Sequence, residues 1–329
     1  MIGIGVIGFG YWGPLLARQF DLPGRSRVAV VCDPDPARLA LAAAQHPQAE
    51  TTHDAGELLR APGVDAVVVA TPARSHFELA MKAFDAGRHV LVCKPMTETS
   101  LQAQRLIDAA GRRGLVLLVD HTFVYAPAVQ AMAAVVREGR LGQVHYWDAV
   151  RVNLGLFRPD VNVLWDLAIH DLAVLDHVLG ARPEAVSATG AGHVEGWPEN
   201  LAYLTLFLPG GAIAHVNVNW LAPIKLRRTI VGLSGGMIVH DEMQPDAKLR
   251  IHDKGVSLQA PGLGYRNGEA VALATEGPEP LAREAEHFLD CIEQGAAPIT
   301  GAPMALRLIG LLEHAERSLR ARGAPIAVT

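Results

Sequence analysis

The chain has 329 residues, of which 50% are hydrophobic. A chain of this length exceeds what one hydrophobic core usually fills, so we expect two domains that each bury a core. The formal net charge is −5, and acidic and basic residues are interspersed. This balance excludes the basic surface with which nucleic-acid-binding proteins displace phosphate counterions, so we expect no nucleic-acid partner.

The cysteines and the apolar runs indicate the compartment. Cys32, Cys93 and Cys291 are odd in number, far apart and outside any C-x-x-C pair, which favours a reducing environment. No apolar run approaches the roughly 20 residues of a membrane helix. Residues 2–7 have the pattern of a buried strand and not of a basic leader. We therefore expect a cytoplasmic protein that is neither exported nor inserted in a membrane.

Up to residue 120, short apolar runs alternate with amphipathic segments. Between the runs, apolar residues recur at helical three- and four-residue steps, as in Phe77, Ala80 and Phe84. Strands that are apolar on both faces are typical of a parallel sheet covered by helices. The expected strands are Ile2–Ile7, Val28–Cys32, Ala66–Ala70, His89–Cys93 and Leu115–Val119.

After Val119 the pattern changes to β-like runs with few helices, which favours an antiparallel or mixed sheet. The fold class is therefore α/β: residues 1–121 form a doubly wound Rossmann domain, and residues 122–329 form an α+β domain. We expect residues 255–268 to be an exposed loop. The expected helices are Ala128–Arg137, Asp166–Val178, Ala282–Glu293 and Pro303–Arg320, and the expected strands are Val144–Val152, Val186–Ala188, Ala202–Leu208, Ile213–Trp220 and Thr229–Leu233.

A glycine fingerprint follows the first expected strand. Gly8, Gly10 and Gly13 give G-x-G-x-x-G, with Phe9, Tyr11 and Trp12 between them. In the dinucleotide-binding motif the first glycine permits a tight turn, the second lets the backbone approach a pyrophosphate, and the third lets the helix pack on the strand. The alternative is that these glycines only shape a turn.

Asp33 ends the second expected strand, twenty positions after Gly13, where a carboxylate can accept both hydroxyls of the adenosine ribose. The same carboxylate would repel a 2′-phosphate, so we expect NAD in preference to NADP. Two alternatives stay open. Arg38 in the next helix could reach a phosphate, and Asp33 could simply cap that helix.

Two further groups carry candidate chemistry. Lys94 follows the fourth expected strand, at the sheet edge where open α/β sheets bind ligands, although a surface lysine is the alternative. Asp166 and His170 stand four residues apart, which puts both on one helix face and lets the carboxylate orient the imidazole as a proton acceptor. A solvated helix contact is the alternative here. We expect no metal, because H-E-x-x-H and a third ligand are missing.

Other polar residues are weaker candidates, and caps or internal hydrogen bonds would explain them equally well. Thr71, Pro72 and His76 follow the third long strand, and His121 follows the last one, so these four could contact the cofactor. Arg151, Asn153 and Asn162 flank the Asp166/His170 helix and could bind substrate hydroxyls or phosphates.

Together these motifs resemble the glucose–fructose oxidoreductase, inositol dehydrogenase and MocA (Gfo/Idh/MocA) family over essentially the whole chain. The matching pieces occur in family order, up to the Ser318-Leu319 stretch of the last helix. Two positions depart from the family pattern: Cys93 replaces the usual glutamate before Lys94-Pro95, and Asp120 replaces the usual glycine before His121.

The resemblance implies roles for the residues. Lys94 would help to hold the reacting hydroxyl and the cofactor, His170 would be the acid/base, and Asp166 would hydrogen-bond to substrate or to His170. The second domain would hold a large, mostly antiparallel sheet whose open face forms a homodimer or homotetramer. The cofactor set is Gly8, Phe9, Gly10, Tyr11, Trp12, Gly13, Asp33, Thr71, Pro72, His76, Lys94 and His121, and the substrate set is Lys94, Tyr125, Arg151, Asn153, Trp165, Asp166 and His170.

The expected reaction is hydride transfer between a nicotinamide and a secondary alcohol or ketone of a sugar. The run from Arg151 to Asp171 looks like members that act on nucleotide-linked or amino sugars. Fold similarity does not choose the substrate. Three alternatives therefore stay open: an NADPH-dependent ketosugar reductase, an inositol or cyclitol dehydrogenase, and a dinucleotide-binding module without catalysis.

Overall fold

The computed structural model describes residues 1–155, 157–259 and 262–328. Two compact units make up the chain. The first unit comprises Met1–Tyr125 and Glu279–Gly310, and the second comprises Ala126–Pro278 and Leu311–Thr329. The division expected from the sequence, after residue 121, kept residues 279–310 in the second domain. In the structure this late segment packs with the first unit instead.

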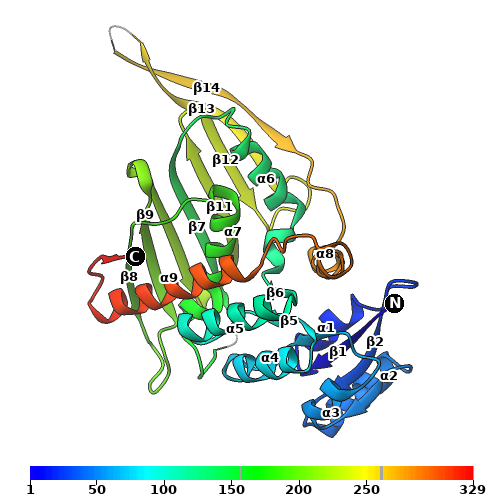
Figure 1. The fold of residues 1–329 in the computed structure, drawn as a ribbon. Helices are drawn as coiled ribbons and strands as arrows, with labels where there is room; N and C mark the ends of the chain where they lie inside the picture. The colour runs from blue at the N-terminus through cyan, green and yellow to red at the C-terminus, as the bar shows by residue number, and fades with distance from the viewer. Residues whose placement is uncertain (156, 260–261, 329) are drawn as a thin grey trace. The chain divides into compact units, whose positions relative to one another are not determined.

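The first unit is built on a six-stranded sheet in which every neighbouring pair is parallel (Figure 1). The order β3-β2-β1-β4-β5-β6 is that of the Rossmann fold, so the expected doubly wound domain is confirmed. The short β3 was not expected from the sequence. The strands are β1 (Ile2–Ile7), β2 (Ser26–Cys32), β3 (Glu50–Thr52), β4 (Ala66–Val69), β5 (His89–Cys93) and β6 (Leu117–Asp120).

Helices connect these strands, and local sequence sets where several of them begin and end. Asp35 and Thr99 accept backbone N–H groups at the starts of α2 and α5, and Gly114 ends α5 in the left-handed conformation. The helical segments are α1 (Gly13–Arg18), α2 (Pro36–Gln45), α3 (Ala55–Arg60), η1 (Ala73–Ser75), α4 (His76–Asp85), α5 (Ser100–Arg113), η2 (Thr122–Tyr125) and α8 (Pro280–Gln294).

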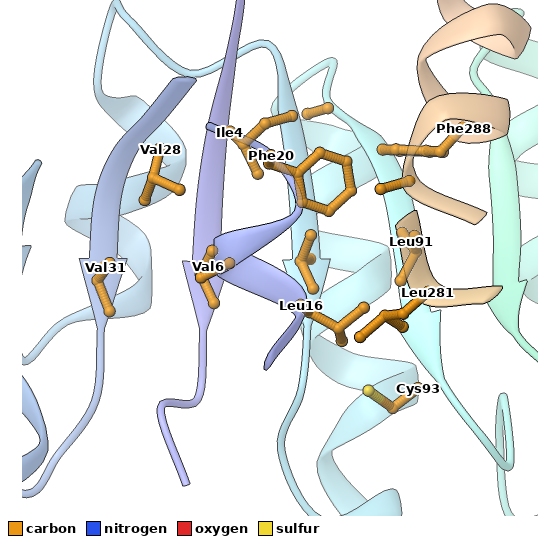
Figure 2. Packing of buried hydrophobic residues seen from close by; sticks show 14 of the residues in the cluster. Ile4, Val6, Leu16, Phe20, Val28, Val31, Leu91, Cys93, Leu281 and Phe288 are labelled. Carbon is orange, nitrogen blue, oxygen red and sulfur yellow. The ribbon is translucent and has the colours of Figure 1, made fainter. Parts of the chain in front are cut away.

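Helix α8 belongs to the first unit because its apolar face completes the core of that unit. Leu281 and Phe288 of α8 are buried in one cluster with Ile4 and Leu91 of the sheet (Figure 2). The rings of Phe20 and Phe288 meet edge to face, with centroids 6.1 Å apart. One core therefore joins segments that lie some 260 residues apart in the chain.

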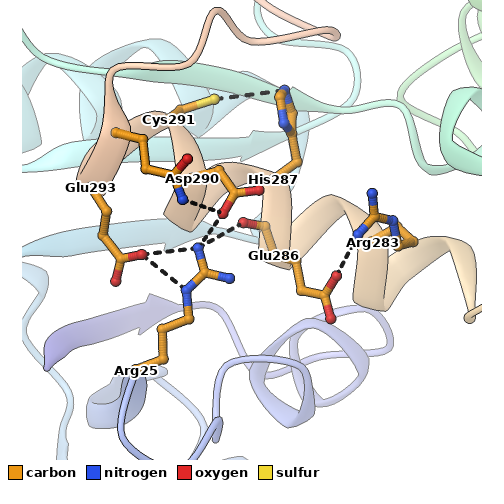
Figure 3. Close-up of polar contacts among 8 residues, drawn as sticks. Arg25, Arg283, Glu286, His287, Asp290, Cys291 and Glu293 are labelled. Carbon is orange, nitrogen blue, oxygen red and sulfur yellow. Dashed lines mark hydrogen bonds and ion pairs between the residues drawn. The ribbon is translucent and has the colours of Figure 1, made fainter.

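Ionic contacts attach the end of α8 to the segment before β2. Arg25 lies against Asp290 and donates through Nε to Glu293 Oε2 at 3.0 Å, and its guanidinium also reaches the carbonyl of Glu286 (Figure 3). The three charged side chains are about one-third exposed. The apolar packing and this ion cluster hold the same helix on the same unit.

The second unit is built on a nine-stranded sheet. Every neighbouring pair in the described part of this sheet is antiparallel except β7 with β10, so the expected mostly antiparallel sheet is confirmed. Its strands are β7 (Val144–Leu154), β8 (Ala185–Ala191), β9 (Leu201–Phe207), β10 (Ile213–Asn219), β11 (Leu221–Leu233), β12 (Gly236–Asp241), β13 (Leu249–Gln259), β14 (Gly262–Leu273) and β15 (Ile326–Ala327).

One expectation in this unit is wrong. Residues 255–268, expected to be an exposed loop, lie mostly in β13 and β14, which pair as a long antiparallel hairpin (Figure 1). Strand β14 is mainly exposed, and three glycines and the polar stretch 266–269 interrupt its apolar positions, a composition that is typical of a loop. Backbone pairing with β13 forms the strand in spite of this composition.

Helices lie on one face of the nine-stranded sheet (Figure 1). In β9 and β10 alternate side chains are buried, as expected for a sheet with one covered face. The helical segments are α6 (Pro127–Arg137), the π-helical turn η3 (Leu164–Ala168), α7 (Ile169–Leu179), η4 (Pro209–Gly211) and α9 (Ala302–Arg320), whose first part clusters with the first unit.

Candidate functional site

Each glycine of the turn in the first unit has a different geometric surrounding. Gly8 has a φ of +94°, and a Cβ there would lie 2.7 Å from the carbonyl oxygen of Ala70. A Cβ at Gly13 would lie 2.1 Å from the carbonyl oxygen of Gly8, so this position accepts no side chain. Beside Gly10 the space is open, with no described atom within 4 Å of an added Cβ. This open space is what a dinucleotide pyrophosphate needs for close backbone approach.

Asp33 lies at the end of β2 and ties two loops together. Its Oδ2 accepts the N–H of Phe9 at 2.6 Å, and its Oδ1 accepts the N–H of Asp35 at 2.9 Å. Asp35, and not Asp33, caps α2 through the N–H of Ala37. A carboxylate has about four acceptor positions, so Asp33 keeps acceptor capacity for ribose hydroxyls. The turn and this carboxylate fit the adenosine half of a dinucleotide.

His76 links the ends of β4 and β5. Its ring is buried, with Nδ1 2.8 Å from the carbonyl oxygen of Pro95 and Nε2 2.7 Å from that of Thr71. Pro72 precedes the short turn η1. The Lys94–Pro95 peptide bond is cis. Through these two contacts His76 fixes the backbone next to Lys94. Lys94 itself is half-buried and follows the carboxyl end of β5.

A buried carboxyl pair lies at the same edge of the sheet. Asp120, at the end of β6, is hydrogen-bonded to Glu284 of α8, and the two side chains are almost completely buried. Burial and the neighbouring Asp120 raise the pKa of Glu284 well above its usual range, which favours its protonated form. Glu284 was not predicted as a site residue from the sequence. The sequence held one indication of its burial: Glu284 lies on the apolar face of an amphipathic helix, between Leu281 and Phe288.

His121 and Tyr125 lie in the interior beside this pair. The backbone N–H of His121 donates to Glu284 Oε1 at 3.0 Å, and the Tyr125 hydroxyl lies 3.0 Å from Thr300 Oγ1. Burial, then the charge of Glu284, raises the pKa of Tyr125, which keeps this phenol neutral. A substrate hydroxyl would have to share Tyr125 with Thr300, so the structure gives Tyr125 an internal role first.

In the second unit, Asp166 and His170 stand on either side of a change in helix type. Asp166 lies in the π-helical turn η3, and His170 lies in the first turn of α7. Asp166 Oδ2 accepts the indole N–H of Trp220 at 3.1 Å, and its Oδ1 lies 3.9 Å from Arg158 Nη1. Both Asp166 and His170 are partly exposed. Single π-helical turns inside helices are frequent at functional sites.

Asn162 acts as a cap, which is the structural alternative that the sequence left open. Its Oδ1 accepts the backbone N–H groups of Leu164 and Trp165, at 3.1 and 3.3 Å. Trp165 itself is buried, and Asn153 is partly exposed near the end of β7. Asn162 therefore fixes the turn that carries Asp166.

Arg151 lies in a buried ion network and is not exposed to solvent. Its guanidinium donates twice to Asp171, at 2.8 and 3.2 Å, and once to Glu242 Oε1 at 3.1 Å. Arg227 donates to the other oxygen of Glu242 at 3.2 Å. Burial alone would lower the pKa of Arg151, but Asp171 and Glu242 raise it. Among the expected substrate-binding residues, Arg151 thus has a structural role that explains its position.

An aromatic cluster beside Asp166 was not found from the sequence. The ring of Phe157 lies 5.5 Å from that of Trp220 and 6.4 Å from that of Trp197, centroid to centroid. Trp197 is 40% exposed. These rings come from three distant parts of the chain, so no local pattern could join them. Phe157 is partly exposed like Trp197, whereas Trp220 is buried. The two accessible rings, with the partly exposed Asp166 and Arg158, can offer both apolar and polar contacts to a ligand.

The thiols and acidic groups give no other reactive centre within the described ranges. All three cysteines are free and buried, and burial raises the pKa of both Cys32 and Cys291 to about 11. In residues 1–155, 157–259 and 262–328, no group of three or more His, Cys, Asp or Glu is arranged to hold a metal ion. No helix in those same ranges combines the length and the apolar character needed to cross a bilayer.

Two family models match the chain. The model described as "Oxidoreductase family, NAD-binding Rossmann fold" matches residues 2–121, and the "GFO/IDH/MocA C-terminal domain" matches residues 129–239. The first match covers the glycine turn, Asp33, Lys94 and His121. The second covers Asp166, His170 and Trp220.

Characterised relatives are similar over most of the chain. UDP-N-acetylglucosamine 3-dehydrogenase from Acidithiobacillus ferrooxidans is 33% identical over 292 residues, which cover 88% of this chain and 88% of that protein. A solved structure of that dehydrogenase, GnnA, aligns with a TM-score of 0.83 at 29% identity, covering 98% of this chain and 99% of that one. D-apiose dehydrogenase from Paraburkholderia graminis is 27% identical over 327 residues, covering 91% of this chain and 82% of that protein.

Proposed function

Because the chain belongs to the Gfo/Idh/MocA family of NAD(P)-dependent oxidoreductases, we propose that it transfers a hydride between NAD and a secondary alcohol carbon of a sugar or nucleotide sugar. The observation that carries this proposal is the glycine turn, in which Gly8 and Gly13 have no room for a side chain while the space beside Gly10 is open.

The first unit supplies the proposed cofactor contacts. The turn from Gly8 to Gly13 would hold the pyrophosphate, and Asp33 would accept the ribose hydroxyls. The buried carboxylate of Asp33 also disfavours a 2′-phosphate, which supports NAD over NADP. Arg38 is exposed on α2 and is the residue that an NADP-dependent enzyme would use here.

The proposed chemistry assigns one role to each reactive side chain. Bound NAD supplies the acceptor for the hydride that leaves the alcohol carbon. His170 takes the hydroxyl proton as the carbonyl forms, and Lys94 stabilises the developing negative charge on that oxygen. Asp166, fixed by Trp220, orients His170 or a substrate hydroxyl. In the reverse direction His170 returns this proton to the oxygen, while Lys94 stabilises the negative charge on that oxygen.

A carbohydrate substrate is supported by the aromatic cluster and by a relative. The accessible rings of Phe157 and Trp197 pack with the buried Trp220, which holds the charged Asp166. Sugars combine apolar C–H faces with polar hydroxyls, so such a surface suits them. The 33%-identical relative from Acidithiobacillus ferrooxidans acts, by its name, on a nucleotide sugar.

We also propose that the protein is a cytoplasmic homodimer or homotetramer that assembles through the open face of its nine-stranded sheet. Tyr203 and Ile213 on that face are 41% and 45% exposed, although their strand neighbours are buried. Exposed apolar side chains on a large sheet are typical of an interface. The free, buried thiols are consistent with a reducing compartment.

His170→Ala tests the assignment. If His170 is the acid/base, turnover of the responsive sugar should fall by about 10² to 10⁴-fold, while NADH affinity stays nearly unchanged. The assay uses purified protein, a panel of sugars, cyclitols and nucleotide sugars, and both NAD and NADP. His177→Ala is the matched control, since His177 lies on the same helix α7 and contacts Gln130.

Full turnover by His170→Ala across the pH range would remove His170 from the mechanism. Tighter binding of NADPH than of NADH would favour the ketosugar reductase. Absence of reduction with every panel member, together with tight NADH binding, would favour the module without catalysis.

A further inference from the structure

Trp12 connects the glycine turn to the buried carboxyl pair. It lies between Gly10 and Gly13, directly before α1, and its indole N–H donates to Asp120 Oδ2. Asp120 stands at the carboxyl end of β6, more than 100 residues away in the chain. One hydrogen bond therefore joins the proposed pyrophosphate turn to the far strand of the same sheet.

Neutral donors surround the two carboxyl groups. Thr122 donates its N–H to Asp120 Oδ1 at 3.2 Å, and its hydroxyl lies 3.1 Å from Glu284 Oε2. The N–H of His121 donates to Glu284 Oε1. Asp120 is 4% exposed and Glu284 is fully buried. Two such carboxyl groups in hydrogen-bond contact cannot both ionise without a large penalty, so the pair keeps one proton and one negative charge.

The other titratable groups near the pair come from each element packed against it. Cys93 of β5 pairs with Asp120 across the strands and is hydrogen-bonded to it, and Lys94 follows Cys93. Tyr125 of η2 interacts electrostatically with Glu284. Burial and the charge of Asp120 raise the pKa of the Cys93 thiol well above its usual range, and that of Tyr125 is also raised. The neutral form of each of these two groups is therefore favoured.

We propose that Asp120 and Glu284 form a positioning pair that holds Trp12, and through Trp12 the turn from Gly8 to Gly13, in the conformation that receives the dinucleotide. A fixed turn binds its ligand more tightly because less ordering is needed on binding. A hydrogen bond to a charged acceptor is about twice as strong as a neutral one, so the single negative charge of the pair strengthens the hold on Trp12. This inference rests on the proposed cofactor site.

The two departures from the family pattern become one feature in this arrangement. Cys93 and Asp120 lie opposite each other on neighbouring strands. The carboxyl group that the family usually carries before the lysine is here on the adjacent strand, where it reaches Trp12. The pair therefore acts on the cofactor turn through Trp12.

A double-mutant cycle tests the link. Asp120→Asn keeps an acceptor but removes the charge, and Trp12→Phe removes the donor while keeping a ring. We expect each variant to bind NADH about 5- to 10-fold more weakly, from the difference between charged and neutral hydrogen bonds. The double variant should lose no more than either single variant. Titration of nicotinamide fluorescence measures all four dissociation constants.

Asp65→Asn is the matched control. Its carboxylate accepts the N–H of Gly3 at 2.8 Å, at the opposite end of the same sheet. It should bind NADH like the wild type. Additive losses in the double variant, or wild-type affinity in a folded Asp120→Asn protein, would overturn the proposal.

The pH profile gives a readout that a purely structural role would not move. When Glu284 loses its proton, the buried pair carries two charges and its hydrogen bond is lost. NADH affinity of the wild type should therefore fall as the pH rises through the raised pKa of Glu284, whereas Glu284→Gln should show a flatter profile. A parallel fall in both proteins would overturn the role of Glu284.

A cofactor-independent measurement separates this proposal from the proposed function. In the protein without NADH, hydrogen exchange of the backbone amides from Phe9 to Ala17 should be faster in Asp120→Asn than in the wild type. If the wild type binds no NADH, the proposed function fails, and the exchange rates still decide whether the pair fixes the turn. Unchanged exchange rates in Asp120→Asn would overturn the proposal that the pair fixes the turn.

Discussion

Each of the two units buries a cluster of ionisable side chains, and the cost of burying charge is offset in a different way in each cluster. In the first unit, Asp120 and Glu284 meet as like groups, and a retained proton on Glu284 avoids the second charge. In the second unit, Arg151 faces Asp171 and Glu242, and opposite charges compensate one another. Burial opposes ionisation of Glu242, yet Arg151 and Arg227 lower its pKa overall.

The difference predicts how each unit responds to change. A cluster that depends on a proton is sensitive to pH, because the proton leaves when the pH passes the pKa of the group. A cluster that depends on opposite charges is sensitive to the loss of one partner, because the remaining charge stays buried. The first unit should therefore respond to titration, and the second to substitution.

The largest expected effect is in the second unit. Arg151→Met leaves Asp171 without its bidentate partner and Glu242 with Arg227 alone, so the free energy of unfolding should fall by about 3–5 kcal/mol. Urea unfolding followed by circular dichroism measures the change. Arg140→Met, which removes an exposed pair with Glu138, is the control and should change stability by less than about 1 kcal/mol. A loss below 1 kcal/mol for Arg151→Met would mean that the buried charges are solvated after all.

The next largest effect is the pH dependence of stability in the first unit. The folded-state pKa of Glu284 is raised above its ordinary value of 4.5, so its contribution to stability is complete at lower pH and disappears as the pH rises through the raised pKa. Relative to Glu284→Gln, the wild type should lose up to about 1.4 kcal/mol of unfolding free energy per pH unit in that window. Urea midpoints from pH 5 to 9 measure the slope. Glu286→Gln on the same helix should follow the wild type, and a wild-type curve parallel to that of Glu284→Gln would contradict the assignment.

The smallest effect concerns how α8 is held on the first unit. Arg25→Met removes a partly exposed guanidinium from Asp290 and Glu293 and should cost about 1 kcal/mol, because solvent screens such pairs. Arg283→Met, which breaks an exposed contact with Glu286 in the same helix, should cost about 0.3 kcal/mol. Thermal unfolding distinguishes the two variants. Equal effects would mean that apolar packing alone retains α8.

Local sequence patterns predicted much of the first unit correctly. The runs at β1, β4 and β5 are apolar on both faces, and the glycine spacing fits a strand followed by a helix, so periodicity alone indicated a parallel sheet. The same reasoning failed on β13 and β14. Glycines and polar residues interrupt the short apolar alternations of these strands, so residues 255–268 had the composition of a loop although their backbones pair.

The candidate site was predicted residue by residue but not in its contacts. Lys94, Asp166 and His170 are identified by spacing and by family order, and their roles in catalysis stay predictions. Glu284, Trp197 and Trp220 were missed because their partners lie far away in the chain. Arg151 was expected to bind substrate, and only the positions of Asp171 and Glu242 reveal its structural role.

By itself the sequence determined the Rossmann sheet, the glycine turn and the identities of the polar residues at the strand ends. Each of these features follows from patterns of residues that are near one another in the sequence. Only the tertiary structure decided that α8 returns to the first unit, that Asp120 meets Glu284, and that Trp12 bonds to Asp120. An amphipathic helix shows that it must cover an apolar surface without showing which one. A carboxyl group likewise acquires its charge state from neighbours that folding alone brings together.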